Sequence, residues 1–230
     1  MATGAETGPG LAKQELYYSV KGHPVDCYIF GAGKPATLVI AGIHGNELPG
    51  VWLAQDLLKD LKLRPARDFN GQIIVIPLAN PDGFLARSRV NAHGIDLNRN
   101  FPAKNFRKGH FSKDFNPGKK PASEPETKMI LEIAAKYMPD LIITLHAEMG
   151  CINYDGPAQE IAARISEING LPVKSSIGYP TPGSLGTYFG VERGIPVITL
   201  ELLPNDNQWR RHGKAILTVM GLPHSGNPVG

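Results

Sequence analysis

Four short runs of apolar residues recur along the chain, at residues 37–42, 72–78, 140–145 and 196–200. Continuous apolar runs of this length are typical of strands that are covered on both faces. Between and after them lie stretches whose spacing predicts helices. These cover residues 48–61, 123–137, 157–169, 184–193 and 206–220. Ser123 and Glu126 match a capping box, which predicts Ser123 as the N-cap of its helix.

Two further strands are expected near the start of the chain. They cover residues 16–20 and 25–30 and form a hairpin that turns at residues 22–24. An antiparallel hairpin beside parallel strands makes the sheet mixed. The pattern therefore predicts an α/β fold with three layers (α/β/α) around a mixed, mainly parallel central sheet. Residues 80–121 lack a regular pattern, and loops this long are often functional.

Composition narrows the class of protein. The chain has 230 residues, of which 42% are hydrophobic and 20% are charged. These values are ordinary for a globular protein of one domain, and they exclude a disordered chain, a collagen and a coiled coil. The formal net charge of +3 argues against a dedicated nucleic-acid binder. No apolar run approaches the length of about 18 residues that a membrane-spanning helix needs.

Residues 1–12 have neither the basic nor the apolar region of a signal peptide. We expect a flexible leader or a tag remnant there, followed by one domain over residues 13–230, and a cytoplasmic location. The two cysteines, Cys27 and Cys151, are too few for a disulfide scaffold or a cysteine-rich zinc module. Histidine and carboxylate side chains would therefore have to hold any metal.

Polar side chains stand where several of the apolar runs end. His44 and Glu47 follow residues 37–42, His146 follows residues 140–145, and Glu201 follows residues 196–200. In open α/β sheets, ligands bind beyond the carboxyl ends of the strands. We therefore expect these side chains to gather at one edge of the sheet.

His44 and Glu47 are three residues apart on a turn that enters a helix, so both can point at one place. Two histidines and a glutamate are an established ligand set for a catalytic zinc, which lowers the pKa of its bound water to about 7. Plainer interpretations remain open. The spacing occurs by chance, Glu47 also suits a helix start, and His146 also suits a hydrogen-bonded core histidine.

A carboxylate at position 201, at the end of an apolar strand, needs a partner or a task. One task is that of a general base beside a zinc-activated water. The alternative is an ion pair with Arg99 or Arg193. In the long loop, Asn98 and Arg99 can hold a carboxylate, because the planar arginine fork binds it with two hydrogen bonds.

The stretch of residues 104–120 is basic and carries interleaved aromatic residues. The residues concerned are Lys104, Arg107, Lys108, Lys113, Lys119 and Lys120, with Phe106, Phe111 and Phe115 between them and Asp114 as the one acid. This composition is compatible with a solvated loop, a nucleic-acid groove or a rim that attracts an acidic substrate.

Six motifs occur in an order that resembles the zinc carboxypeptidases. They are Gly42–Glu47, Asn80–Gly83, Gly94–Pro102, Ser123–Glu126, Leu145–His146 and Thr199–Glu201, and the resemblance covers roughly residues 37–203. Two further stretches, Gly178–Ser184 and Cys151–Ile152, are similar to a bacterial branch of this family. Enzymes of that branch cut the amide bond between γ-D-glutamate and meso-diaminopimelate in murein peptides during cell-wall recycling.

The resemblance implies a metal centre with one zinc ion per chain. His44, Glu47 and His146 would be its ligands. Asp96 would accept the second N–H of His44 and so fix the tautomer of that ring. Glu201 would take a proton from the attacking water and pass it to the leaving amine.

The resemblance also implies how the substrate is held. Arg89 matches the arginine that stabilises the oxyanion, with Arg87 as the alternative. Asn98 and Arg99 would hold the free carboxylate of diaminopimelate, and Tyr179 would lie on the substrate side. The expected partner is a small murein tripeptide, with no nucleic acid and no membrane.

Glu148 departs from the pattern of the digestive carboxypeptidases. If its strand continues, it shares a face with His146, where it either meets the amino group of diaminopimelate or is solvated. Two other functions remain open. One is a zinc deacylase of the aspartoacylase or desuccinylase type, although about thirty residues after Glu201 leave no room for the β-domain of those proteins. The other is a metal-free protein that binds acidic peptides.

Overall fold

The structure, a computed structural model, describes residues 13–109, 112 and 114–223. The leader expected over residues 1–12 lies outside the described residues. Within the described ranges, one eight-stranded sheet has the order β1-β2-β4-β3-β5-β8-β6-β7. Its strands are β1 (Lys13–Tyr18), β2 (Pro24–Gly31), β3 (Ala36–Ala41), β4 (Gln72–Ile76), β5 (Leu141–Ala147), β6 (Cys151–Asp155), β7 (Val173–Lys174) and β8 (Val197–Leu202).

The centre of the sheet is parallel. Strands β4, β3, β5 and β8 run side by side in the same direction, and they are the four strands that the apolar runs predicted. The hairpin β1–β2 adds antiparallel strands at one edge, and β6 pairs antiparallel with β8 at the other. The predicted mixed, mainly parallel sheet is confirmed.

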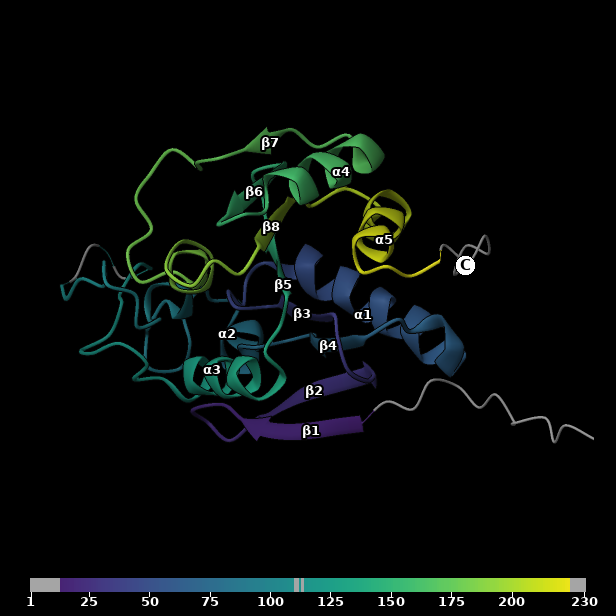
Figure 1. Cartoon of the computed structure of the whole chain (residues 1–230). Helices are drawn as coiled ribbons and strands as arrows, with labels where there is room; N and C mark the ends of the chain where they lie inside the picture. Colours follow the sequence, from purple (N-terminus) through teal and green to yellow (C-terminus); the bar gives the residue numbers. More distant parts are fainter. Residues whose placement is uncertain (1–12, 110–111, 113, 224–230) are drawn as a thin grey trace, which may run out of the picture.

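Helices cover both faces of the sheet, which makes the three layers (Figure 1). One face carries α1 (Leu48–Leu63), α4 (Gln159–Asn169) and α5 (Gln208–Val219). The opposite face carries α2 (Pro81–Ala86), α3 (Pro125–Tyr137) and the π-helical turn η3 (Gly186–Val191). Each face has its own cluster of buried apolar side chains. None of the helices in the described part of the chain is long and apolar enough to cross a membrane.

The start of α3 differs from the prediction. Glu124 is the N-cap residue and Pro125 opens the helix, with no side-chain hydrogen bond at the cap. Ser123 lies one residue too early, and its hydroxyl instead donates to the Glu124 carboxylate at 2.6 Å. Asn100 holds this turn, because its side-chain oxygen accepts from the Glu124 amide at 3.2 Å. The proline explains the shift, since its fixed φ and missing N–H suit the first helical position.

The sequence pattern missed several short elements. The long loop contains α2 and the 3-10 segment η2 (Leu97–Arg99), and another 3-10 segment, η1 (Ala66–Asp68), follows α1. Strands β6 and β7 were also missed. Strand β6 has five residues and strand β7 has two, which is too short for a clear pattern. Segments this short acquire their conformation from the neighbours that pair with them.

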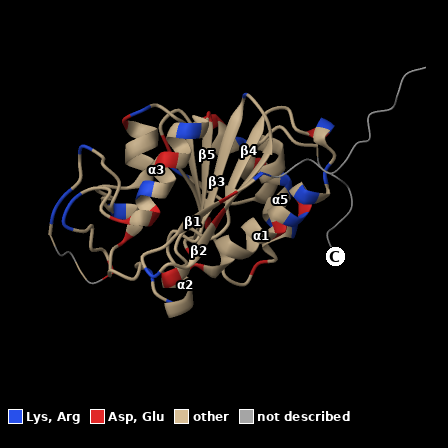
Figure 2. Cartoon of the chain, turned by 90° about the horizontal axis from the view of Figure 1, so that it is seen from below, with Lys and Arg blue, Asp and Glu red and all other residues tan. Residues whose placement is uncertain are grey.

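The described residues of the basic stretch 104–120 lie in loops at one end of the molecule. Figure 2 shows basic segments along the loops beside α3, away from the covered faces of the sheet. Residues Phe111 and Lys113, which belong to this stretch, lie outside the described residues. Of its other aromatic residues, Phe115 lies against Arg89 and Arg99 at the carboxyl edge of the sheet.

Candidate metal centre

Three side chains meet where β3 and β5 end. Strand β3 stops at Ala41, and the chain turns through Gly42, whose φ of +63° is accessible to glycine without strain. This turn delivers His44, and Glu47 stands immediately before the first residue of α1. His146 is the penultimate residue of β5, which pairs with β3 in parallel. The topology therefore brings together groups that are 102 residues apart in sequence.

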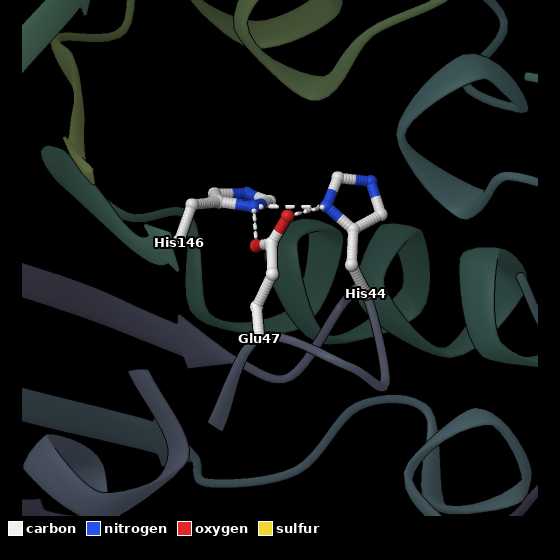
Figure 3. A group of neighbouring side chains, drawn as sticks. All are labelled: His44, Glu47 and His146. Carbon is white, nitrogen blue, oxygen red and sulfur yellow. Dashed lines mark hydrogen bonds and ion pairs between the residues drawn. The ribbon is translucent and has the colours of Figure 1, made fainter. Parts of the chain in front are cut away.

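The three ligand atoms lie within 4.8 Å of one another (Figure 3). Glu47 sits between the two imidazoles, with Oε1 2.7 Å from His44 Nδ1 and Oε2 2.7 Å from His146 Nδ1. The two Nδ1 atoms are themselves 3.1 Å apart. All three residues are buried. Inward-facing ring nitrogens around one carboxylate form a donor set that fits a single zinc ion.

The electrostatics of this cluster favour a bound cation. Burial alone would lower the pKa of His44, but the carboxylates of Glu47 and Asp96 raise it to about 9. Burial would raise the pKa of Glu47, and the two histidines hold it well below its usual range. Glu47 is thus a buried anion that needs positive charge beside it. A divalent metal supplies that charge while leaving both imidazoles neutral.

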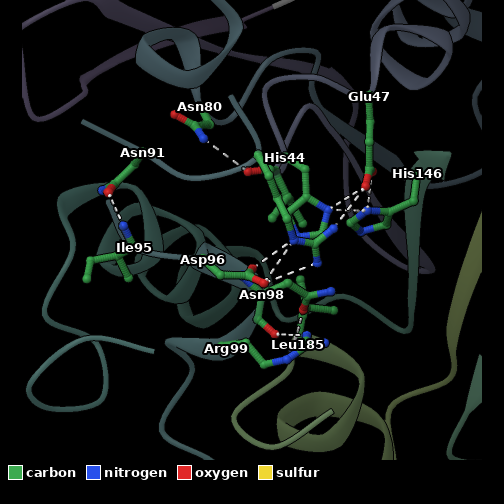
Figure 4. A network of polar contacts seen from close by, with 12 residues as sticks. His44, Glu47, Asn80, Asn91, Ile95, Asp96, Asn98, Arg99, His146 and Leu185 are labelled. Carbon is green, nitrogen blue, oxygen red and sulfur yellow. Dashed lines mark hydrogen bonds and ion pairs between the residues drawn. The ribbon is translucent and has the colours of Figure 1, made fainter. Parts of the chain in front are cut away.

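Asp96 orients His44 from behind (Figure 4). Its Oδ1 lies 3.0 Å from His44 Nε2, so the outer nitrogen carries the proton and Nδ1 is left to face the cluster. Asp96 also accepts hydrogen bonds from the Asn98 amide at 2.9 Å and from Arg89 Nε at 3.1 Å. Burial would raise the pKa of Asp96, but His44 and the arginines Arg89 and Arg99 hold it well below its usual range.

Glu201 faces the same cluster from β8. It stands opposite His146 in the register of β5 and β8, and both residues line a cavity of about 80 Å³ with His44 and Glu47. Burial raises the pKa of Glu201. Neither ion pair that the sequence left open is formed. Arg193 forms an ion pair with Glu192 instead. Among the described residues, Glu201 and Arg99 form no ion pair.

The two candidate arginines are placed differently. Arg89 lines the cavity, and its Nη1 lies 3.4 Å from Glu47 Oε1. Arg87 is the exposed C-cap residue of α2, in a left-handed conformation, and does not line the cavity. The geometry therefore selects Arg89 over Arg87 as the cation beside the cluster.

The remaining predicted substrate residues line the same cavity. Asn98, Arg99 and Tyr179 form its wall on the side of η2 and of the loop before η3. Asn98 is fixed by the Leu185 amide, which donates to its side-chain oxygen at 2.9 Å. Arg99 is buried and Tyr179 is 48% exposed, so the tyrosine is the member that remains open to solvent.

Phe115 is a residue of the site that sequence reasoning did not assign. Its ring stacks on both arginines, with Arg89 Cζ 4.9 Å and Arg99 Cζ 5.7 Å from the ring centre. With Arg99 and Tyr179 it lines an adjoining cavity of about 560 Å³. In the sequence, Phe115 is visible as an aromatic residue inside a basic loop. No local pattern predicts that its ring contacts Arg89 and Arg99, which are distant in sequence.

Glu148 is not where strand geometry would put it. Strand β5 ends at Ala147, so Glu148 does not continue the face of His146. Its side chain is exposed and lines a separate pocket beside the start of α1.

These features define an α/β protein with a candidate single-metal centre at the carboxyl edge of its sheet. The chain belongs to the zinc carboxypeptidase family, whose model matches residues 5–207. It is accordingly a peptide-bond hydrolase.

Individual proteins of known sequence or structure are similar to this chain to different degrees. The chain is 32% identical over 184 residues to murein peptide amidase A of Escherichia coli strain K12, which covers 75% of this chain and 73% of the relative. The crystal structure of murein-tripeptide amidase from Escherichia coli O157 superposes with a TM-score of 0.78 at 28% identity, covering 96% of each chain. A structure of an aspartoacylase family protein from Mesorhizobium loti has a TM-score of 0.65 at 21% identity, covering 96% of this chain and 69% of the other.

Proposed function

We propose that this chain is a zinc-dependent amidase that hydrolyses the bond between γ-D-glutamate and meso-diaminopimelate in murein peptides. The observation that carries the proposal is the convergence of His44, Glu47, His146 and Glu201 on one cavity in a chain similar to murein peptide amidase A. The likeness to the aspartoacylase family protein, at 21% identity, is one of fold alone and does not favour a deacylase.

In this proposal His44, Glu47 and His146 hold the zinc ion. When bound, zinc polarises the amide carbonyl and makes a water molecule acidic enough to attack at neutral pH. Asp96 keeps the proton of His44 on Nε2, so that Nδ1 carries its lone pair toward the metal. The ligands are held by a buried network before substrate arrives, which avoids reorganisation during the reaction.

Glu201 acts as the general base. It accepts a proton from the attacking water and returns it to the nitrogen of the leaving amine. Burial raises its pKa, which brings the carboxyl closer to the strength that a proton shuttle needs. Arg89, at the wall of the same cavity, donates to the carbonyl oxygen as that atom becomes negative. Asn98 and Arg99 hold the free carboxylate of the leaving half, and Tyr179 covers it from the solvent side.

The proposal extends to the setting of the reaction. We infer a role in cell-wall recycling, in the cytoplasm, because the substrate is a small murein tripeptide. Both cysteines are unpaired and buried, and this state suits a reducing compartment.

The test is incubation with L-Ala-γ-D-Glu-meso-diaminopimelate, followed by mass analysis of the products with and without a chelator. Release of diaminopimelate that stops on chelation supports the proposal. Cleavage of N-acyl amino acids without release of diaminopimelate would indicate a deacylase. Peptide binding without bound zinc, and indifferent to chelator, would indicate a binding protein.

Glu201→Gln isolates the proton transfer. We expect this variant to keep its zinc and to lose about 10²- to 10⁴-fold in kcat, because the amide cannot accept the proton. Glu167→Gln, a change on the exposed side of α4, serves as the control. Near-normal turnover by Glu201→Gln with full zinc content would remove Glu201 from the mechanism.

A further inference from the structure

A pocket of about 380 Å³ lies beside the metal-centre cavity. The two share Glu47, Arg89 and Ala147, whereas Arg99 and Tyr179 line the metal-centre cavity and not this pocket. The wall of this second pocket comes from the first turns of α1, which supply Trp52, and from the chain just after β5, which supplies Glu148. In the proposed reaction, Arg99 and Tyr179 hold the leaving half. The second pocket is therefore the one available to bind the acyl half of the substrate.

Of the three charged residues that line this pocket, two have charged partners and one does not. Glu47 contacts both histidines, and Arg89 forms an ion pair with Asp96 at 3.1 Å. Glu148 has no hydrogen bond or ion pair with any residue that the structure describes. The pocket therefore presents one carboxylate without an ion-pair partner, and such a group attracts a cationic ligand.

Trp52 supports the same conclusion. Helical spacing puts it on the apolar stripe of α1, yet the side chain is 46% exposed and forms part of the pocket wall. A pocket lined by both a large aromatic ring and an unpaired carboxylate accommodates an ammonium group together with a small apolar substituent. An anionic or purely apolar ligand would leave the Glu148 charge unmatched.

We propose that Glu148 binds the free N-terminal ammonium of the acyl half, and so determines specificity for peptides with an unblocked N-terminus. This inference rests on the proposed function. In L-Ala-γ-D-Glu-meso-diaminopimelate the γ-linkage puts seven bonds between the alanine nitrogen and the scissile carbonyl carbon, so the ammonium can reach about 8 Å beyond that carbon. Glu148 follows the metal ligand His146 by two residues, and the pocket that it lines shares Glu47 and Ala147 with the metal-centre cavity. A peptide whose alanine nitrogen is acylated has no charge to offer this carboxylate.

The experiment compares kcat/KM for the free tripeptide with kcat/KM for the same peptide acetylated on its alanine nitrogen. We expect the wild-type chain to favour the free peptide about fivefold or more, the size expected of a partly exposed ion pair. Glu148→Gln should bring this ratio close to one, and Glu148→Lys should push it below one. The control Glu167→Gln should keep the wild-type ratio. Equal rates on both peptides in the wild-type chain, or an unchanged ratio in Glu148→Gln, overturn the inference.

A binding measurement separates this inference from the proposed function. Calorimetric titration with the dipeptide L-Ala-γ-D-Glu, and with its N-acetyl form, needs no turnover. Preferential binding of the free dipeptide that Glu148→Gln weakens about fivefold supports the pocket assignment even if no diaminopimelate is released. Release of diaminopimelate with equal affinity for the two dipeptides, or with binding of neither, upholds the amidase and refutes the role of Glu148.

Discussion

We expect His212 to make the stability of the protein depend on pH. It lies in α5 with its side chain fully buried, and Asn169 of α4 donates a hydrogen bond from Nδ2 to His212 Nδ1 at 3.1 Å. The proton of the neutral ring is therefore on Nε2, which has no hydrogen-bond acceptor. Burial, aided by the nearby charge of Arg211, lowers the pKa of His212 to about 4 and outweighs the opposite effect of the Asp206 carboxylate, which lies 4.0 Å from Nε2. The folded state thus holds this ring neutral.

The sign and size of the effect follow from linkage. An unfolded histidine has a pKa of about 6.5, so below that value the unfolded chain binds a proton that the folded chain refuses. As far as His212 is concerned, the free energy of unfolding is highest above about pH 6.5, and it decreases as the pH falls toward 4. The pKa difference corresponds to about 3 kcal/mol in full, and to about 2 kcal/mol between pH 8 and pH 5. This is a large part of the 5–15 kcal/mol that is typical of a domain.

The assay is urea unfolding of the zinc-loaded protein at pH 8 and pH 5, compared with His212→Gln. The zinc ligands titrate in both proteins, so the difference between the two pH dependences isolates His212. We expect the wild-type chain to lose about 2 kcal/mol more than the variant over this range. A direct NMR titration of the ring provides the second measurement. A ring that titrates near 6.5, or equal pH dependences of the two proteins, refutes the reasoning.

Three further predictions follow from other contacts. Gly45→Ala places a Cβ 2.0 Å from the Gly83 carbonyl carbon, whereas at Gly22 a Cβ meets nothing within 4 Å, although its φ is +77°. Thermal unfolding should show a loss of about 3 kcal/mol for Gly45→Ala and about 1 kcal/mol for Gly22→Ala, and equal losses would contradict the close approach. Asp96→Asn should weaken zinc affinity about 10- to 100-fold in a chelator competition, because its amide no longer fixes the His44 tautomer; unchanged affinity would exclude that role. Arg99→Lys should raise KM for the tripeptide more than it lowers kcat, since lysine lacks the bidentate fork; an unaltered KM would show that Arg99 does not hold the carboxylate.

Much of the site was predictable because a parallel sheet places the residues that follow its strands at one edge. The ends of β3, β5 and β8 carry His44, His146 and Glu201, and parallel strands align their carboxyl ends at one edge. The apolar runs identify those strands without reference to the rest of the chain. The choice between Arg87 and Arg89 was open in the sequence, since both stand in the same loop. The structure separates them because Arg87 ends α2 and points to solvent, while Arg89 pairs with Asp96.

Sequence alone determined the layered fold, the four central strands and the residues at their carboxyl ends, because apolar runs and helical spacing are local properties of the chain. Tertiary structure decided which strands are neighbours, that Phe115 stacks on two arginines, that His212 is buried against Asn169, and that Glu148 leaves β5 to line a second pocket. Each of these depends on segments far apart in sequence. Their packing sets the exposure and charge environment of a side chain, and no local pattern encodes it.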